Sequence, residues 1–283
     1  MLIAEAKRAV DALGLRGRSV LVAVSGGLDS SALAHALLEI AREKRLKVAI
    51  AHVNHGLRGA ESEADAKAVA ELAARLGAPG FERRIDPARL REGVPSRARP
   101  TLQEAARELR YRALREMAAE AGCAHIATAH TADDQAETVL LRLLRGSGPD
   151  GLGGIPERSA DGVVVRPLLR VARREIEAYA RERGLSWRED RSNESLAYAR
   201  NRLRLRWLPG LAADFNEQLL RAVADLAEAQ RRDSEWIAEV VEREAVARFE
   251  LEGGWLRARA EGWDELPEAL ARRIARWALR RCG

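Results

Sequence analysis

Short apolar runs rich in valine, isoleucine and alanine alternate with longer segments of helical periodicity through the first half of the chain. The apolar runs cover residues 19–24, 47–53 and 124–129, and the helical patterns cover residues 30–42, 61–76 and 102–120. Because continuous apolar strands separated by helices are typical of βαβ units, the alternation predicts an α/β fold, a Rossmann-like parallel sheet with helices on both faces. Ligands bind such sheets at the carboxyl ends of the strands, which makes polar residues there the candidate site.

The length and the later part of the chain predict a second, smaller domain. The 283 residues are at or beyond the length at which a single hydrophobic core stops growing. Residues 211–249 have the pattern of a helix, a Gly-Gly break follows, and Pro267 opens a last helix at a favourable first-turn position. We therefore predict an α/β domain over residues 1–210 and a small, mainly helical domain over residues 211–283.

The sequence SGGLDS, residues Ser25 to Ser30, directly follows the first apolar run. Gly26 and Gly27 permit backbone conformations that turn amides towards an anion, the serine hydroxyls add donors, and a helix starting near Ser30 presents its positive end. Neither GxxxxGK[ST] nor a GxGxxG after the first strand is present. The stretch is thus a candidate phosphate loop of another kind, and a purely structural turn is the alternative.

Three acids follow the strand that ends near Ala129. Asp133 and Asp134 precede Glu137 by four and three residues, which places the three carboxylates on one face of a first helical turn. Acids in that position also simply complement the helix dipole. The alternative is that the carboxylates hold a substrate ammonium group and accept its proton.

The histidines fall into two groups, according to whether they follow a predicted strand or lie within a predicted element. His52, His55 and His130 follow predicted strands and are candidate site residues, whereas His35 in a helix and His125 in a strand are expected to be structural. Two cysteines, Cys123 and Cys282, form no CxxC, so neither a zinc site nor an iron–sulfur site is indicated and no disulfide framework is expected. With no signal peptide pattern and no membrane-span pattern, we expect a cytoplasmic protein with no membrane partner.

Basic residues gather in two segments, in a chain whose net charge is +5. Residues 166–206 hold twelve arginines against six acids, and residues 81–115 hold ten arginines against five acids. Such segments suit a polyanionic partner such as RNA. A solvated, arginine-rich surface is the alternative.

The motifs together resemble a known family. SGGLDS is similar to the pyrophosphate loop of the ATP pyrophosphatases, often called PP-loop enzymes. Six further motifs, in the same order, resemble those of the tRNA(Ile)-lysidine synthetases within that group. They are HVNHGLR at 52–58, ARELRY at 106–111, TAHTADDQAET at 128–138, RPLL at 166–169, EDRSN at 189–193 and RNRLR at 200–204. The resemblance covers roughly residues 18–210.

The resemblance implies an ATP-dependent ligase that forms a C–N bond. ATP adenylates O2 of the wobble cytidine in the CAU anticodon of tRNA(Ile), free L-lysine attacks C2, and AMP and pyrophosphate are released. The implied cofactors are ATP and Mg²⁺, and the implied partners are tRNA(Ile) and lysine, with a homodimer as a family-based expectation. Many members of the family continue into a further C-terminal domain, so we expect this chain to be either a short form or a fragment.

The resemblance also implies roles for single residues. ATP binding is expected at Ser25, Gly26, Gly27, Leu28, Asp29, Ser30, His52 and His130, with Asp29 also holding the metal. Lysine binding is expected at Asp133, Asp134 and Glu137. The residues expected to contact tRNA are His55, Arg58, Arg110, Arg200 and Arg204. The residues expected to take part in catalysis are Asp29, Arg107, Asp134, Glu137 and Arg202.

Two alternatives for the function stay open. One is an ATP pyrophosphatase with another acceptor, such as a tRNA thiolase or a small-molecule amidotransferase. The missing CxxC disfavours the thiolase, and the HVNH and DDQAET runs disfavour the other acceptors. The second alternative is a nucleotide-binding or RNA-binding module without catalysis, which the presence of Asp29 and the three carboxylates disfavours.

Overall fold

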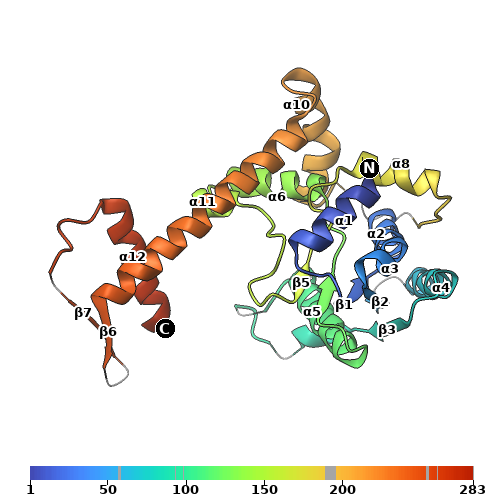
Figure 1. Cartoon of the computed structure of the whole chain (residues 1–283), viewed down its shortest axis with the longest axis horizontal. Helices are drawn as coiled ribbons and strands as arrows, with labels where there is room; N and C mark the ends of the chain where they lie inside the picture. Colours follow the sequence, from blue (N-terminus) through green and yellow to red (C-terminus); the bar gives the residue numbers. More distant parts are fainter. Residues whose placement is uncertain are drawn as a thin grey trace.

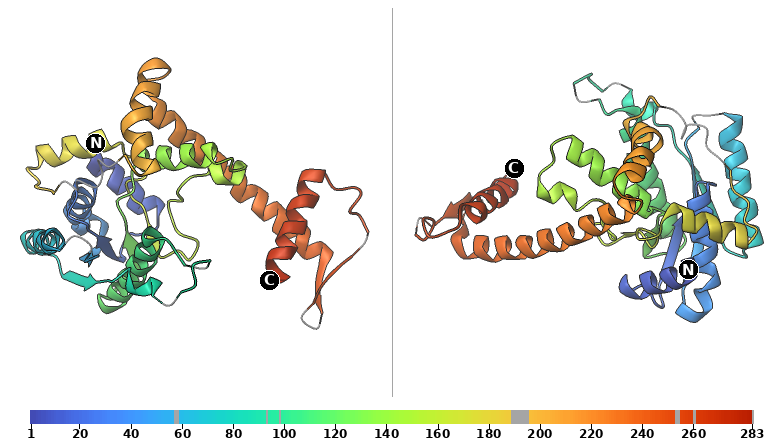
Figure 2. Two further views of the ribbon diagram at one scale, coloured as in Figure 1. Left: turned by 180° about the vertical axis from the view of Figure 1, so that it is seen from behind. Right: turned by 90° about the horizontal axis from the view of Figure 1, so that it is seen from above.

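A computed structural model describes residues 1–56, 59–92, 94–97, 99–188, 196–252, 255–259 and 261–282. Figure 1 shows a larger body that contains the sheet and a smaller C-terminal unit, which the long helix α11 (Leu219–Arg248) joins to it. Seen from above in Figure 2, the C-terminal unit stands out from the body at the far end of α11.

The body is built on a parallel sheet with the strand order β3-β2-β1-β4-β5. The strands are β1 (Ser19–Ala23), β2 (Lys47–Asn54), β3 (Gly80–Arg84), β4 (His125–Ala127) and β5 (Val164–Val165). The predicted parallel sheet is thus confirmed. Strand β3 was not among the predicted strands, because it lies at the sheet edge and carries one apolar residue, Phe81, among charged and exposed neighbours.

Helices cover both faces of the sheet, as predicted. On one face, Val20 and Val22 of β1 pack in a core with residues from α1 (Leu2–Ala12), α2 (Leu28–Glu39), α4 (Ala60–Arg75) and α8 (Arg173–Glu182). On the other face, Leu21 packs with Leu114 and Met117 of α5 (Leu102–Glu120). Successive side chains of a strand point to opposite faces, so a continuous apolar strand such as β1 requires cover on both sides.

The strand order creates a switch point between β1 and β4. The chain leaves β1 towards β2 and leaves β4 towards β5, in opposite directions along the sheet, while Val22 of β1 pairs with Ala127 of β4. Helix α2 therefore starts beside α6 (Ala132–Leu144), at the same edge of the sheet. Ligands of open α/β sheets bind at such a switch point.

Short helical segments complete the body. They are α3 (Ala41–Lys44), η1 (Arg89–Arg91), α7 (Pro149–Leu152), α9 (Ala199–Arg202), the π-helical turn η3 (Leu203–Trp207) and α10 (Leu208–Asp214).

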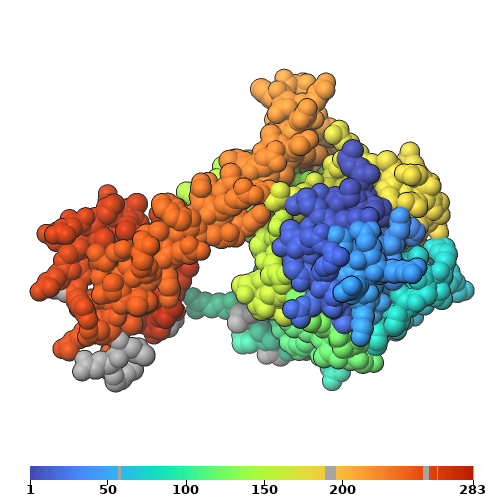
Figure 3. All heavy atoms as spheres, in the orientation of Figure 1, coloured from blue at the N-terminus to red at the C-terminus, as the bar shows by residue number. Residues whose placement is uncertain are grey.

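Helix α11 has 30 residues and spans about 45 Å at the usual rise per residue. Near its start, Val223 and Ala227 pack on Ala136 and Val139 of α6. Near its end, Val241 and Ala245 pack in a separate small core with Ile274 of α12 (Glu268–Cys282). Since α11 contributes to both cores, the division into domains at residue 210 stays a prediction. Figure 3 shows the helix crossing from one part to the other.

The C-terminal region differs from the prediction in two ways. The single helix expected over residues 211–249 is broken after α10 at a turn in which Asn216 accepts a hydrogen bond from the main-chain N–H of Gln218, at 2.9 Å. Beyond α11, the strands β6 (Phe249–Glu252) and β7 (Trp255–Ala258) form an antiparallel hairpin, so the region is not wholly helical. Two short alternating runs around a Gly-Gly pair are a hairpin signal, which the helical reading overlooked.

Candidate active site

The loop after β1 is held by its own serines. The Oγ atom of Ser30 accepts a hydrogen bond from the main-chain N–H of Ser25 at 3.1 Å and donates to the carbonyl of Gly27 at 3.1 Å. Gly26 has φ +90°, a conformation that L side chains rarely adopt, and Gly27 caps α2 without a side chain. The loop therefore folds around the start of α2, whose first-turn amides have no side-chain cap and are available to an anion.

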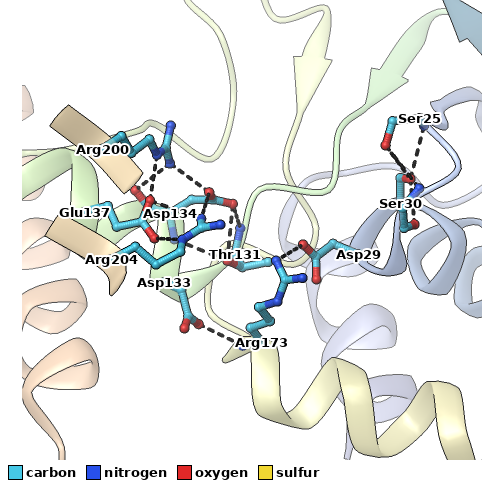
Figure 4. Close-up of polar contacts among 11 residues, drawn as sticks. Ser25, Asp29, Ser30, Thr131, Asp133, Asp134, Glu137, Arg173, Arg200 and Arg204 are labelled. Atoms are coloured by element: carbon cyan, nitrogen blue, oxygen red, sulfur yellow. Dashed lines mark hydrogen bonds and ion pairs between the residues drawn. The ribbon is translucent and has the colours of Figure 1, made fainter. Parts of the chain in front are cut away.

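Asp29 and Arg173 form an ion pair across the mouth of this loop (Figure 4). The guanidinium of Arg173 donates from Nη1 to Oδ2 of Asp29 at 3.3 Å. The other oxygen of Asp29 is buried and has no hydrogen-bond partner among the described atoms. Burial raises the pKa of Asp29 to about 6, Arg173 opposes that rise, and Asp134 and Asp133 add to it. The carboxyl group is thus poised for a cation to satisfy its free oxygen.

His52 braces the loop from the neighbouring strand. Its side chain is 6% exposed, and its Nδ1 atom lies 2.9 Å from the carbonyl oxygen of Val24, to which it is placed to donate. Asn54, at the end of the same strand, accepts from the N–H of Gly56 at 2.9 Å and donates to Glu63 at 3.2 Å. His55 is partly buried and makes at least one polar or electrostatic interaction within the chain. Arg58, the other predicted tRNA-binding residue of this segment, lies outside the described residues.

The second half of the site is the start of α6. Thr131 caps the helix: its Oγ1 accepts from the N–H of Asp134 at 3.2 Å, and the carboxylate of Asp134 accepts from the N–H of Thr131 at 2.9 Å. Asp133 points the other way and accepts from the main-chain N–H of Arg173 at 2.7 Å. Arg173 therefore ties the first turn of α6 to α2, through its main chain on one side and its side chain on the other.

Glu137 is 1% exposed and is held by two arginines from the segment after α8. Arg200 donates from Nε to Glu137 at 2.6 Å and from Nη2 to Asp134 at 2.7 Å. Arg204 donates from Nη2 to the same carboxylate of Glu137 at 3.1 Å and lies 3.5 Å from Asp134. Two adjacent turns of chain, α9 and η3, are thereby fixed over the carboxylates of Asp134 and Glu137, whereas Asp133, the third predicted lysine-binding acid, binds the main chain of Arg173 (Figure 4).

Arg202 lies between these two arginines in sequence but not in space. Its guanidinium donates to the main-chain carbonyls of Leu196 and Ala197 at 3.0 and 2.9 Å. The helical spacing explains the difference, because Arg200 and Arg204 share one face of the helix and Arg202 lies on another.

His130 follows β4 and is partly buried. Its Nδ1 atom is 3.0 Å from Oγ1 of Thr128. Burial lowers the pKa of His130 to about 4, Asp134 opposes this shift, and Arg166, Arg110 and Arg200 add to it. His130 is therefore neutral at physiological pH.

Arg107 and Arg110 come from α5 and lie over the ring of Tyr111. Their Cζ atoms are 5.0 and 5.3 Å from the ring centroid. Burial lowers the pKa of Arg110, and Arg107 lowers it further. Arg107, expected to take part in catalysis, and Arg110, expected to contact tRNA, therefore lie together at the ring of Tyr111.

Four residues of this neighbourhood escaped the sequence prediction: Arg173, Arg166, Tyr111 and Thr131. Thr131 had a local signal, a Thr three residues before an acid at the start of a helix. Arg166 and Tyr111 stood within recognised motifs but received no role. Arg173 had no local signal, because only the packing of α8 beside α2 brings it to Asp29.

The fold and the loop together define a PP-loop domain, and the family model with that description matches residues 3–211. Within that class, the chain belongs to the tRNA(Ile)-lysidine synthase family. It is 40% identical to the tRNA(Ile)-lysidine synthase of Chlorobaculum tepidum, over 85% of this chain and 71% of the relative. The synthase of Solibacter usitatus is 43% identical over 93% of this chain and 57% of its own length, and that of Thermus thermophilus is 43% identical over 93% and 49%.

The chain thus spans a little over half the length of several curated relatives that it matches, among them 57% of the Solibacter protein and 56% of the Symbiobacterium thermophilum protein. Among solved structures, the U34-tRNA thiolase of Methanococcus maripaludis has the same fold, with a TM-score of 0.62 and 18% identity over 80% of this chain and 79% of that one. None of the helices in the described ranges combines the length and apolar character that crossing a membrane requires.

Proposed function

We propose that the chain ligates free L-lysine to C2 of the wobble cytidine in the CAU anticodon of tRNA(Ile), with cleavage of ATP to AMP and pyrophosphate. The observation that carries the proposal is the arrangement in which the Ser25–Ser30 loop and the carboxylates of α6 face one another across Arg173. Membership of the tRNA(Ile)-lysidine synthase family supports the same reaction and the same substrates.

The loop supplies the first chemical step. The amides at the start of α2, with the hydroxyls of Ser25 and Ser30, bind the β- and γ-phosphates of ATP. O2 of the cytidine attacks the α-phosphorus, the bond to the bridging oxygen breaks, and pyrophosphate leaves onto the loop. Arg107 stabilises the negative charge on the phosphates, and groups placed where charge develops contribute most to the rate.

Asp29 is the candidate residue for Mg²⁺. Its buried, unpartnered oxygen fits a hard cation that prefers carboxylate ligands. The described residues contain no cluster of three metal-binding side chains, so the phosphates of ATP must provide further ligands. When bound, Mg²⁺ neutralises charge on those phosphates.

The carboxylates of α6 serve the second step. Asp133 and Asp134 hold the ε-ammonium of lysine, and one of them accepts the proton that makes the amine nucleophilic. The amine then attacks C2, the bond from C2 to O2 breaks, and AMP leaves with that oxygen. Glu137, whose carboxylate is enclosed by Arg200 and Arg204, is better suited to positioning those arginines than to meeting lysine directly.

The contacts with RNA follow from the same geometry. His55, Arg58 and Arg110 stay predictions for the tRNA surface. Arg200 and Arg204 are turned into the site, so we propose that they meet the reacting cytidine and its adenylate rather than the outer stem. The cytidine has to leave its stack for C2 and O2 to be reached, which an anticodon loop permits. A homodimer and a cytoplasmic location also stay predictions.

The test of this function follows the fate of ATP. The chain is incubated with labelled Mg-ATP and an unmodified tRNA(Ile) transcript bearing CAU, without and with lysine, and AMP and pyrophosphate are measured. The proposal expects pyrophosphate release that depends on this tRNA. Release that needs a different acceptor, such as a sulfur donor or a small amide donor, would instead favour another ATP pyrophosphatase.

A further inference from the structure

Arg188 contacts both the phosphate loop and helix α4, and the proposed reaction gives it no role. Its main-chain N–H donates to the carbonyl oxygen of Gly26 in the loop at 3.0 Å. Its guanidinium forms an ion pair with Asp65 on α4, in which Nε donates to Oδ1. One residue from the segment beyond α8 thus links two elements that are far from it in the sequence.

The segment that carries Arg188 is anchored in the body. Trp187, the residue before Arg188, packs against the core that β1, α2, α4 and α8 share. Asp65 is 9% exposed, so the packing of α4 holds its carboxylate in place. A hydrogen bond between two charged groups is roughly twice as strong as a neutral one. Arg188 therefore cannot move away from the loop without losing the ion pair with Asp65.

Gly26 lies against α4, beside Asp65. A Cβ atom added to Gly26 would lie 3.7 Å from Cγ2 of Val69 and 3.9 Å from the main-chain oxygen of Asp65. Gly26 has φ +90°, and a glycine has no side chain that restricts its backbone to one conformation. Contacts from outside the loop therefore help to decide how the peptide after Gly26 is turned, and the hydrogen bond from Arg188 is such a contact.

The hydrogen bond to Gly26 sets the direction of the next amide. The peptide bond between Gly26 and Gly27 is trans, so its C=O and N–H groups point in opposite directions. Because the carbonyl is turned to Arg188, the N–H of Gly27 points away from Arg188 and lies 3.4 Å from Oγ of Ser25. That distance is longer than is usual for an N–H···O bond, so the amide keeps capacity to bind an anion. Arg188 thus fixes the direction of a loop amide that is available to a phosphate.

We propose that Arg188 and Asp65 are positioning residues for the phosphate loop. Their ion pair holds the main chain of Arg188 in place, and that main chain holds the Gly26–Gly27 peptide in the orientation that binds pyrophosphate. A peptide turned the other way would present the carbonyl oxygen of Gly26 to the phosphates and repel them. The proposal rests on the proposed function, in which the loop binds the β- and γ-phosphates of ATP and then the pyrophosphate.

The test measures the binding of inorganic pyrophosphate, with Mg²⁺, to the full chain by calorimetry. Arg188→Gln and Asp65→Asn each remove the ion pair and are each expected to weaken pyrophosphate binding by roughly 10-fold. The matched control is Arg83→Gln on β3, which breaks an ion pair with Glu120 at 3.0 Å. The side chain of Arg83 is 45% exposed and that of Arg188 is 44% exposed, so the two substitutions remove similar groups. The control should bind pyrophosphate as the wild type does.

Two comparisons separate positioning of the loop from a general loss of structure. The binding of AMP, which lacks the β- and γ-phosphates, should change by less than about 2-fold in Arg188→Gln. In the double variant, Asp65→Asn should cost little once Arg188→Gln is present, because the two side chains act as a pair. Equal losses of AMP and pyrophosphate binding, or strictly additive losses in the double variant, would overturn the positioning role.

The positioning role and the proposed reaction fail in different ways, because pyrophosphate binding needs neither tRNA nor lysine. Unchanged pyrophosphate binding in folded Arg188→Gln and Asp65→Asn would overturn the positioning role, even if the wild type attaches lysine to tRNA. Weakened pyrophosphate binding in a chain that attaches no lysine would uphold the positioning role while removing the reaction. Should Asp65→Asn fail to fold, Arg188→Gln gives the same comparison at an exposed side chain.

Discussion

The guanidinium of Arg173 lies 3.3 Å from Oδ2 of Asp29, a contact between residues 144 positions apart in the chain. The main-chain N–H of the same arginine donates to Asp133 at 2.7 Å. Arg173 thus fixes the distance between the loop that holds phosphates and the helix that carries the carboxylates. It also opposes the effect of burial on the pKa of Asp29, which is about 6.

Activity should therefore depend on the ionisation of Asp29. If ionised Asp29 is required, kcat/KM for ATP falls as pH drops through about 6. Arg173→Ala removes the attraction that favours the charged form, so this acidic limb should move to higher pH by roughly one unit. The matched control is Arg174→Ala, which changes the exposed neighbour and should leave the profile in place. An unshifted limb in Arg173→Ala would show that another group controls it.

The ionised carboxylate of Asp29 should lower the stability of the folded chain at neutral pH. Its pKa in the folded chain, about 6, is above the ordinary value of 3.8, so the folded chain holds the proton more tightly than the unfolded chain. The loss of stability on deprotonation is absent below about pH 4 and complete above about pH 7. Asp29→Asn should thus raise the melting temperature at pH 8 by roughly 2 to 4 °C and leave it nearly unchanged at pH 4.5. A variant that melts lower than wild type at pH 8 would contradict this sign.

Glu137 should stabilise the packing of α9 and η3, which carry Arg200 and Arg204, over the site. Glu137→Gln leaves Arg200 and Arg204 without their buried counter-charge and should reduce the free energy of unfolding by about 2 to 4 kcal/mol. Denaturant unfolding measures the loss. Glu177→Gln, which breaks an exposed ion pair with Arg181, should cost less than about 1 kcal/mol.

A double variant separates the pair from simple loss of packing. Removing Arg204 from the Glu137→Gln chain should cost less than removing it from wild type, because the two side chains act as a unit. Strictly additive losses would mean that Glu137 and Arg204 do not stabilise each other.

The two glycines of the loop should respond differently to a methyl group. Gly26 has φ +90°, so Gly26→Ala should be strained and lose about 1 to 2 kcal/mol of stability. Gly27 has φ −77°, and an added Cβ would lie 3.5 Å from Oγ of Ser25, an ordinary contact. The free energy of unfolding of Gly27→Ala should therefore lie within about 0.5 kcal/mol of the wild-type value. Equal losses in both variants would contradict the backbone geometry assigned to the loop.

The parts of the fold that the sequence predicted are those with local physical causes. Apolar runs such as β2 are buried on both faces, so their composition alone indicates a parallel strand. The acids of α6 share one helical face because of their spacing. Strand β3 gave no such signal, since an edge strand with exposed charged residues has no apolar run.

The relations that complete the site are tertiary and lie beyond local pattern. Nothing near Arg173 in the sequence indicates its ion pair with Asp29. Arg202 shows the converse, because its motif implied a part in catalysis while its guanidinium donates to the main chain at 3.0 and 2.9 Å. Helical phase, set by how α9 and η3 dock on α6, decides which arginines enter the site.

The most direct measurement is the transfer of lysine itself. The chain is incubated with Mg-ATP, labelled lysine and an unmodified tRNA(Ile) transcript bearing CAU, with a methionine tRNA bearing the same anticodon as the control. The account predicts label in the isoleucine tRNA alone, and no label with Asp29→Asn. Absence of label from both tRNAs, while ATP is still cleaved with some other acceptor, would contradict the proposed ligation.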